Sequence, residues 1–487
     1  MKKLLAAVLI ACQPGFAGLA ENIQKLIDGN PASRTAFWGI QVVDLASGKT
    51  LYELNPDHYF EPASNTKLFS TALALNRLGA DFRFQTRVVA ETAPEANGRI
   101  SGALYLIGGG DPNLSARAVP YQKGPITGNP LAAIEDLAAQ IAARGVKRVE
   151  GGITGDDTWY LWEPYASGWG IDDPQSDDGP PISALTLTDN AQTLHIAPGH
   201  AAGDLAALTL NPPIEFYRID NRVRTIAVGG ERRIRFKRIP GSRDAQLWGT
   251  IPLRDRGQDM AISIEDPAEY AARALQIALE TRGVEVVGGV RARHQYPDDA
   301  PRPEPQGVEL ARRSSASLLD DLRITDKVSQ NLHAELALRA AGKARRNEGG
   351  FAAGLDEMKA FLTEIGIDAN AWHFMDGSGL SRQGLLTPNT VVKLLRYMYD
   401  SPARADWISL LPIAAQDGSL STRFGDTPAA GRVHAKTGSL AHVSALSGYI
   451  ERPDGTWLAF SILVNNFNGR TAEVRGVMDR ICNLILE

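Results

Sequence analysis

Cysteine is almost absent from this sequence of 487 residues, with only Cys12 and Cys482 present. If Cys12 is removed with an N-terminal leader, the mature chain keeps one thiol and has no internal disulfide. Small secreted scaffolds that depend on disulfides are therefore excluded. A chain of this length can bury enough apolar surface to be stable without such cross-links.

An excess of positive charge is also lacking, because the formal net charge is −5. This balance argues against nucleic acid as a partner, since a large nucleic-acid footprint needs a basic surface. The histidines show no H-E-x-x-H or other close ligand spacing, so a zinc peptidase is disfavoured and no metal is expected. The glycine-rich stretch at 108–112 lacks the Gly-Lys-Ser/Thr of a phosphate loop and is interpreted as a turn. We expect no cofactor.

Long apolar runs are missing except at the N-terminus. Two lysines there precede an apolar run at 4–11, and small residues follow. This is the layout of a secretory signal peptide, and the run is too short to span a bilayer. We expect a signal peptide over residues 1–20, cleaved near Ala17 or Ala20, and a periplasmic mature protein. Lipoprotein processing at Cys12 and a buried N-terminal helix are the alternatives.

The two ends of the chain carry matching patterns. Residues 35–45 and 50–56 flank a turn, which is typical of a β-hairpin, and residues 444–467 form a second hairpin. A final helix from about residue 471 has apolar residues at i, i+3 and i+4 spacing. We interpret this apolar stripe as packing on a sheet, with a membrane-surface anchor and peripheral membrane association as the alternative. The ends together predict one α+β domain, an antiparallel sheet flanked by helices.

The middle of the chain contains a repeat. Residues 129–153 and 266–290 both start at Asn/Asp-Pro, reach Arg-Gly-Val where a helix is expected to end, and continue into a strand. In the first copy, Asn129 is predicted as the N-cap and Pro130 as the first helical residue. The copies bracket residues 154–264, which are rich in short alternating strands. This pattern predicts an inserted unit with a β-rich insertion nested inside it.

A serine and a lysine lie three residues apart in EPASNTKLFS, at 61–70, where a turn leads into an apolar helix. That spacing places Ser64 and Lys67 on one face of a helix. A serine hydroxyl is a weak nucleophile until a neighbouring base removes its proton, and a lysine can be that base. The same residues also fit an ordinary helix start, so the pair alone does not establish catalysis.

Two further motifs follow in chain order. DKVSQNLHAEL holds Ser329 and Asn331 at the start of another helix, and VHAKTGSLAHVSAL holds Lys436, Thr437 and Gly438 on a strand. The ordered set S-x-x-K, S-x-N and K-T-G matches the serine–lysine acyl-transfer pattern of penicillin-binding proteins and serine β-lactamases. The middle motif reads Ser-Gln-Asn here, not Ser-Asp-Asn.

The residue types suit acyl transfer. Lys67 accepts the proton of Ser64 if burial and a nearby Lys436 lower its pKa. Ser329 relays a proton between Lys67 and the leaving amine. Asn331 holds Lys67 or a substrate amide by hydrogen bonds.

The strand motif suits substrate binding. The Lys436 charge and the Thr437 hydroxyl fit a terminal carboxylate, and Gly438 lets a substrate backbone lie against the strand because it has no Cβ. A tetrahedral oxyanion needs two backbone N–H donors, which we assign to Ser64 and Ser439.

With these motifs, the chain resembles the D-Ala-D-Ala carboxypeptidases/endopeptidases among low-molecular-mass, class C penicillin-binding proteins. The long interval between Ser64 and Ser329 fits this family, which is known for large inserted domains. The resemblance spans nearly the whole mature chain and extends to LIGGGDPNLS (106–115), SGWGIDD (167–173), PPISALTLTDN (180–190), FMDGSGLSRQGLLTP (374–388) and AAQDGSLSTRF (414–424).

This resemblance implies a serine β-lactamase/transpeptidase-like catalytic domain. It implies removal of terminal D-Ala from peptidoglycan stem peptides and muropeptides, cleavage of D-Ala–diaminopimelate cross-links, and acylation of Ser64 by β-lactams. The domains it suggests are a catalytic domain at 21–91 and 306–487, an inserted domain at 92–153 and 265–305, and a nested β-rich domain at 154–264. Neither the oligomeric state nor the ligands of the inserted domains follow from the sequence.

Other interpretations stay open. A β-lactamase needs a dedicated deacylating base, which we do not find, and an envelope scaffold would not need the intact motifs. The DGSG stretch at 376–379 either lines the cleft or forms a turn. The acid pairs at 156–157 and 172–173 either bind a cation or cap loops. The tryptophans at 159, 162 and 169 either stack on a ligand or pack. His333, His434 and His442 lie near the motifs, with core, rim or catalytic roles.

Overall fold

The computed structural model describes residues 14–486, so Cys12 and most of the predicted signal peptide lie outside the described residues. The first described element is the helix α1 (Pro14–Asp28). It runs through both expected cleavage positions, Ala17 and Ala20. Among the helices within residues 14–486, none combines the length and apolarity needed to cross a membrane.

A five-stranded antiparallel sheet joins the two ends of the chain, as predicted. The strand order is β19 (Val433–Leu440), β20 (Val443–Glu451), β21 (Trp457–Asn465), β1 (Phe37–Asp44) and β2 (Thr50–Leu54). The hairpin β1–β2 has its turn at Gly48, where φ is 71°. The C-terminal hairpin lies beside it because β21 pairs with β1 along its length.

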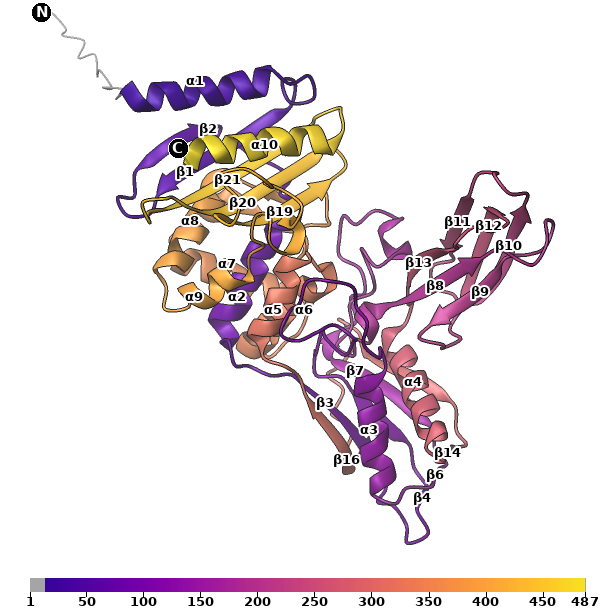
Figure 1. Cartoon of the computed structure of the whole chain (residues 1–487). Helices are drawn as coiled ribbons and strands as arrows, with labels where there is room; N and C mark the ends of the chain where they lie inside the picture. The colour runs from indigo at the N-terminus through magenta and orange to yellow at the C-terminus, as the bar shows by residue number, and fades with distance from the viewer. Residues whose placement is uncertain (1–13, 487) are drawn as a thin grey trace, which may run out of the picture.

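Helices cover both faces of this sheet (Figure 1). On one face lie α1 and α10 (Thr471–Leu486), and the apolar stripe of α10 is buried against the sheet. The stripe is therefore core and not a membrane-facing surface. On the other face a second core is built by α2 (Lys67–Leu78), α5 (Leu318–Lys327), α6 (Asn331–Arg346), α7 (Phe351–Glu364), α8 (Pro388–Asp400) and α9 (Arg404–Leu410).

A second five-stranded sheet lies beside the helical face. Its order is β15 (Val290–Gln295), β7 (Ile153–Leu161), β5 (Leu104–Ile107), β3 (Gln85–Ala90) and β16 (Val308–Ser314). We expect residues 85–90 and 308–314 in the catalytic domain from the sequence, yet β3 and β16 are hydrogen-bonded into this sheet. We therefore propose that the inserted region begins before Gln85 and ends after Ser314.

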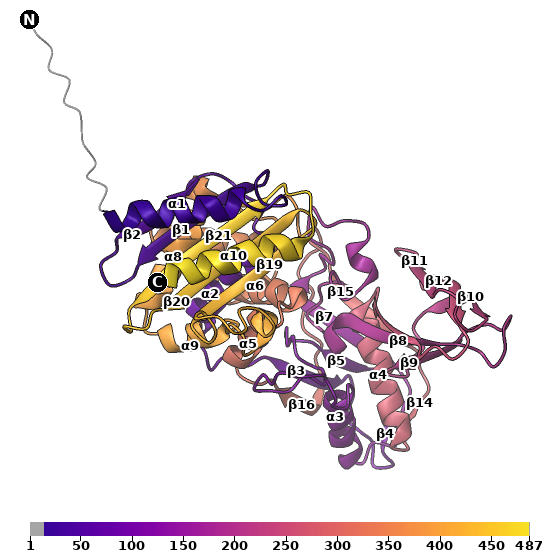
Figure 2. The same cartoon turned by 45° about the horizontal axis from the view of Figure 1, so that its top comes forward.

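The two repeated units lie together in the inserted region. The helices α3 (Ala132–Ala143) and α4 (Pro267–Thr281) contact each other beside the second sheet (Figure 2). Asp266 caps α4 as its Asp-Pro start suggests, accepting from Glu269 N at 3.0 Å. In the first copy the expected cap is wrong: α3 begins at Ala132, because Asn129 Oδ1 instead accepts from Leu131 N within the preceding turn.

Short strands complete the inserted region. One sheet contains β13 (Gln258–Ser263), β8 (Ala191–Ala197) and β9 (Ala207–Asn211), and another contains β10 (Arg218–Ile226), β12 (Asp244–Pro252) and β11 (Arg233–Arg238). A small sheet contains β14 (Glu285–Val286), β6 (Arg148–Val149) and β4 (Arg99–Ile100), and the 3-10 turns of this region are η2 (Asp173–Gln175) and η3 (Thr188–Asn190).

The short elements outside the inserted region are β17 (Trp372–His373), β18 (Leu385–Leu386) and the 3-10 turns η1 (Ala63–Thr66), η4 (Ala369–Ala371) and η5 (Gly418–Leu420).

Candidate active site

Ser64 lies in η1, directly before α2, and Lys67 is the first residue of that helix. The Lys67 ammonium donates to Ser64 Oγ at 2.9 Å. The apolar side chains of α2 are buried in the helical core, which fixes the helix start under the edge of the sheet. The three-residue spacing thus brings hydroxyl and amine together as expected.

Lys67 is fully buried and surrounded by oxygen atoms. Besides Ser64 it donates to Asn331 Oδ1 at 2.5 Å and to the carbonyl oxygen of Ser378 at 2.7 Å. Burial lowers the pKa of Lys67 to about 8, although nearby carboxylates, Asp376 foremost, act in the opposite direction. Roughly a tenth of this lysine is therefore neutral at pH 7, far more than for an ordinary lysine, and the neutral form is the one that a proton acceptor requires.

Lys436 is the second fully buried lysine, in the middle of β19. Its ammonium donates to Ser329 Oγ at 2.8 Å and to the carbonyl oxygen of Thr437 at 2.8 Å. Burial, and after it the charge of Lys67, lower the pKa of Lys436. The charge of Lys67 thus disfavours the charged form of Lys436.

The Ser-Gln-Asn motif forms the turn from α5 into α6. Ser329 has a left-handed φ of 63°, and Asn331 is the first residue of α6. While Asn331 Oδ1 accepts from Lys67, its Nδ2 donates to the Asp178 carbonyl oxygen at 2.7 Å. Asp178 belongs to the inserted region, so that region contacts the site directly.

The start of η1 lies against β19 at close range. Asn65 Nδ2 donates to the Lys436 carbonyl oxygen at 3.0 Å. A Cβ added to Gly438 would lie 2.9 Å from the Pro62 carbonyl oxygen and 3.1 Å from the Ser64 backbone nitrogen. Only glycine permits this approach without displacement. The absence of a side chain at 438 therefore lets the strand lie close to the Ser64 backbone.

The end of the strand motif faces outward. The Thr437 hydroxyl lies 2.7 Å from that of Ser419, on η5. Ser439 is exposed, and Arg475 of α10 donates to its Oγ at 2.7 Å. Residues 412–414 pair with the start of β19, an edge strand of its sheet. Beyond Ala435 no strand of the described residues pairs with its outer side, which can therefore accept another extended chain. Ser419 and Arg475 were not identified from the sequence.

The DGSG stretch is a tight turn that also reaches the site. The Asp376 carboxylate accepts from the backbone N–H of Ser381 at 2.7 Å and from Trp169 Nε1 at 3.0 Å. This turn presents the Ser378 carbonyl oxygen to Lys67. The DGSG stretch therefore both forms a turn and contributes to the site, which were the two alternatives from the sequence. Trp169 connects the inserted region to this turn through its hydrogen bond to Asp376.

Glu335, on α6, holds the DGSG turn by accepting hydrogen bonds from its backbone, and it was not identified from the sequence. Its Oε1 accepts from Gly377 N at 2.8 Å and from Ser378 N at 2.9 Å, and Arg339 pairs with its Oε2 at 3.1 Å. Burial raises the pKa of Glu335 to about 7. The signal available in the sequence was a glutamate one helical turn after Asn331, with an arginine one turn further on.

The other open candidates have structural partners. Trp162 stacks on His294 with ring centroids 4.0 Å apart, and Asp157 pairs with that histidine at 2.9 Å. Asp156 pairs with Arg293. Within residues 14–486, no group of histidines, cysteines and carboxylates is arranged to hold a metal ion.

All eight predicted site residues lie in one region. Hydrogen bonds link Lys67 to Ser64 and Asn331, and Lys436 to Ser329, while Thr437, Gly438 and Ser439 continue along β19. Three segments that are distant in sequence thus build a hydroxyl, two buried amines and a second hydroxyl around one strand edge. This combination can activate a serine and bind an anionic peptide end.

Residues 19–484 match the D-Ala-D-Ala carboxypeptidase 3 (S13) family. The chain belongs to this family. It is 34% identical over 484 residues to a D-alanyl-D-alanine carboxypeptidase of Actinomadura sp. (strain R39), covering 96% of this chain and 86% of that protein. The family and the enzyme class expected from the sequence, a serine-type D-Ala-D-Ala carboxypeptidase, are confirmed.

Solved structures share the fold. Penicillin-binding protein 4 of Haemophilus influenzae matches with a TM-score of 0.82 at 23% identity, covering 96% of this chain and 99% of that one. A predatory endopeptidase of Bdellovibrio bacteriovorus, acylated by penicillin G and bound to an immunity protein, matches with a TM-score of 0.50 at 16% identity, covering 93% and 92%. The predicted fold class is confirmed.

Proposed function

We propose that this protein is a serine DD-peptidase that forms its acyl-enzyme on Ser64. The observation that carries the proposal is the 2.9 Å hydrogen bond between Ser64 Oγ and a fully buried Lys67 whose pKa is lowered to about 8. Ser64 Oγ attacks the carbonyl carbon of the bond before the terminal D-Ala, and its proton passes to Lys67. The carbon–nitrogen bond then breaks, and the amine leaves with a proton.

The leaving amine takes its proton from Ser329. The Ser329 hydroxyl accepts a hydrogen bond from Lys436, so it can give its own proton to the amine and recover one from that lysine. Water then attacks the ester on Ser64 and returns a proton through Ser329 to Lys436, while Lys67 gives its proton back to the Ser64 oxygen and the shortened peptide is released. Asn331 keeps the Lys67 amine directed at Ser64 throughout.

The β19 edge binds the substrate. Lys436 and Thr437 attract the terminal carboxylate, and the backbone N–H groups of Ser64 and Ser439 hold the developing oxyanion. Removal of one such donor raises barriers by roughly 3–4 kcal/mol in other acyl-transfer enzymes. A β-lactam carries both a reactive carbonyl and a carboxylate, so it acylates Ser64 in the same orientation.

The substrates we propose are peptidoglycan stem peptides and muropeptides, at the terminal D-Ala and at D-Ala–diaminopimelate cross-links. The N-terminal sequence pattern supports export to the periplasm, where these substrates are found. Whether the carboxypeptidase or the endopeptidase reaction dominates depends on how much of the cross-linked strand the cleft accommodates.

Purified muropeptides and mass spectrometry test the proposal, because one experiment reads both bonds. We expect loss of terminal D-Ala, cleavage of cross-linked dimers, and neither product with Ser64→Ala. Product formation by Ser64→Ala would show that the nucleophile is wrong. Nitrocefin separates a peptidase from a β-lactamase: we expect one slow turnover and a long-lived acyl-enzyme, and rapid repeated hydrolysis would contradict the peptidase assignment.

A further inference from the structure

A strained turn of the inserted region carries a carboxylate into the catalytic helices. Thr188, Asp189 and Asn190, which form η3, have left-handed φ values of 52°, 55° and 53° in succession. Non-glycine residues rarely adopt this conformation even singly. Asn190 stabilises the turn by donating to the Pro181 carbonyl oxygen at 2.7 Å and accepting from Leu187 N at 3.1 Å.

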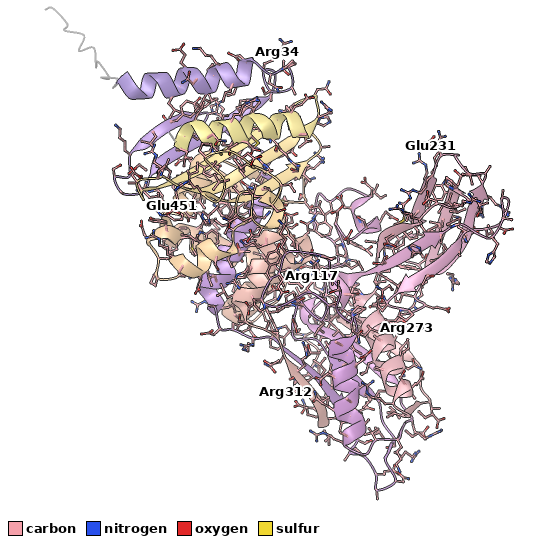
Figure 3. All side chains as sticks on the ribbon, viewed as in Figure 1. Arg34, Arg117, Glu231, Arg273, Arg312 and Glu451 are labelled. Carbon is pink, nitrogen blue, oxygen red and sulfur yellow. The ribbon has the colours of Figure 1, made fainter. Side chains whose placement is uncertain are left out.

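Strain maintained by surrounding contacts often marks a functional position. Here the turn points the buried Asp189 carboxylate at α6. Asp189 Oδ1 accepts from His333 Nε2 at 3.1 Å, and Oδ2 accepts from Gln330 Nε2 at 3.1 Å. Arg117, from the loop before α3, donates through Nε to the same Oδ2 at 2.7 Å. Figure 3 shows Arg117 where the inserted region meets the catalytic helices.

The charges around Asp189 are complementary. Hydrogen bonds from His333 and the charge of Arg117 hold the pKa of Asp189 well below its usual range despite burial. His333 also pairs with Asp321 of α5, Nδ1 to Oδ1 at 2.9 Å, and the two carboxylates raise the pKa of this histidine to about 9. The cluster therefore links α5, α6 and the inserted region through ionised groups.

The important contact is with Gln330, because this residue separates the two functional residues of the middle motif. The Gln330 side chain accepts from Leu332 N at 3.1 Å and so caps α6, while its amide nitrogen donates to Asp189. On either side, Ser329 has a left-handed φ and Asn331 begins the helix. A shift of Gln330 would move the Ser329 hydroxyl and the Asn331 amide together.

We propose that Asp189 is a positioning residue for the Ser329–Asn331 segment and acts through Gln330. This inference rests on the proposed function. It also explains why the motif reads Ser-Gln-Asn: a carboxylate at 330 would face the Asp189 carboxylate, whereas an amide donates to it. The inserted region thus completes the active site, in addition to any ligand it binds elsewhere.

A purely stabilising role is the competing explanation, and the chain contains a matched control for it. Asp157 is another buried carboxylate of the inserted region paired with a histidine, His294, at 2.9 Å. Its other partner is Ser183, at 2.8 Å, and no bond among the described residues joins Asp157 to a motif residue. Asp157→Asn should therefore lower the melting temperature without slowing acylation at temperatures where the protein is folded.

Acylation by a fluorescent penicillin, followed over time, yields the apparent binding constant and the acylation rate constant separately. We expect Gln330→Asp to lower the acylation rate constant about 30-fold, within the range of coupling between contacting groups, with little change in binding. Asp189→Asn in that background should restore most of the loss, because an amide then faces a carboxylate again. Asp157→Asn should leave the rate constant unchanged.

Specific results would overturn the inference. Wild-type rates for Gln330→Asp, no recovery in the double variant, or equal slowing by Asp157→Asn would each do so. If Gln330→Asp does not fold, Gln330→Ala replaces it: about tenfold slower acylation supports positioning, and an unchanged rate refutes it. Failure of the proposed function is distinguishable, because wild-type protein would then not be labelled, or Ser64→Ala would be labelled equally.

Discussion

The start of α2 and the middle of β19 each place a fully buried lysine in the same site, but the two lysines have different surroundings. Lys67 donates to a serine hydroxyl, an amide oxygen and a carbonyl oxygen, and four carboxylates raise its pKa against the effect of burial. Lys436 donates to a hydroxyl and a carbonyl oxygen, and Lys67 further lowers its pKa.

From this difference we propose that the two lysines have different roles. Lys67 is linked to the nucleophile itself, so it is placed to exchange a proton with Ser64. Lys436 is linked to Ser329 and lies on the strand edge that a peptide would join. We propose that a bound substrate carboxylate favours its charged form, which then supplies the proton for the leaving group. The comparison can be tested by changing each region separately.

The largest effect is expected from Lys67→Gln. Glutamine retains a hydrogen-bonding group but cannot accept a proton, so acylation by a fluorescent penicillin should slow about 10³-fold or more. Lys67→Arg should be equally slow, because a guanidinium stays protonated. An arginine variant within tenfold of wild type would show that charge, not proton transfer, is what this position supplies.

Lys436→Gln should slow acylation less, by about 10²-fold at low penicillin concentration, with much of the loss in binding because a carboxylate partner is removed. Lys436→Arg keeps the charge and should recover part of that binding. Titration of the acylation rate against penicillin concentration separates the two contributions. If Lys436→Gln lowered only the acylation rate constant, and as severely as Lys67→Gln does, the two lysines would not have the separate roles proposed here.

The pH dependence of acylation tests the state of Lys67. Because its pKa is lowered to about 8, the neutral fraction, and with it the acylation rate constant, should rise about tenfold from pH 7 to pH 9 and then level off. Asp326, Glu335, Asp376 and Asp178 all raise this pKa, so Asp326→Asn should move the rise to lower pH. A rate constant that falls over this interval in both the wild type and Lys436→Arg, whose charge persists, would exclude neutral Lys67 as the base.

Much of this site was predictable because its chemistry is encoded in short local motifs. Ser64 and Lys67 meet within one helical turn, and the strand motif fixes the order of Lys436, Thr437 and Gly438. The contributions of Asp178 and Asp189 were not predictable, because tertiary folding alone brings the inserted region to α6. Helix starts were also only partly predictable from the sequence. Asp266 caps α4 as expected, whereas Asn129, in a similar Asn-Pro sequence, accepts a hydrogen bond within the turn before α3.

The smallest effect is expected where the two lysine regions touch. Gly438→Ala places a Cβ within 2.9 Å of the Pro62 carbonyl oxygen and 3.1 Å of Ser64 N, so β19 must move away from the nucleophile. We expect about 1 kcal/mol of destabilisation by denaturant unfolding, since mild overpacking has costs of this size, and acylation slowed about fivefold. Gly476→Ala, on α10 where an added Cβ meets nothing within 4 Å, is the matched control and should be neutral or stabilising, because alanine favours a helix more than glycine does. If Gly438→Ala retained both wild-type stability and rate, the close approach of β19 to Ser64 would not be what joins the two regions into one site.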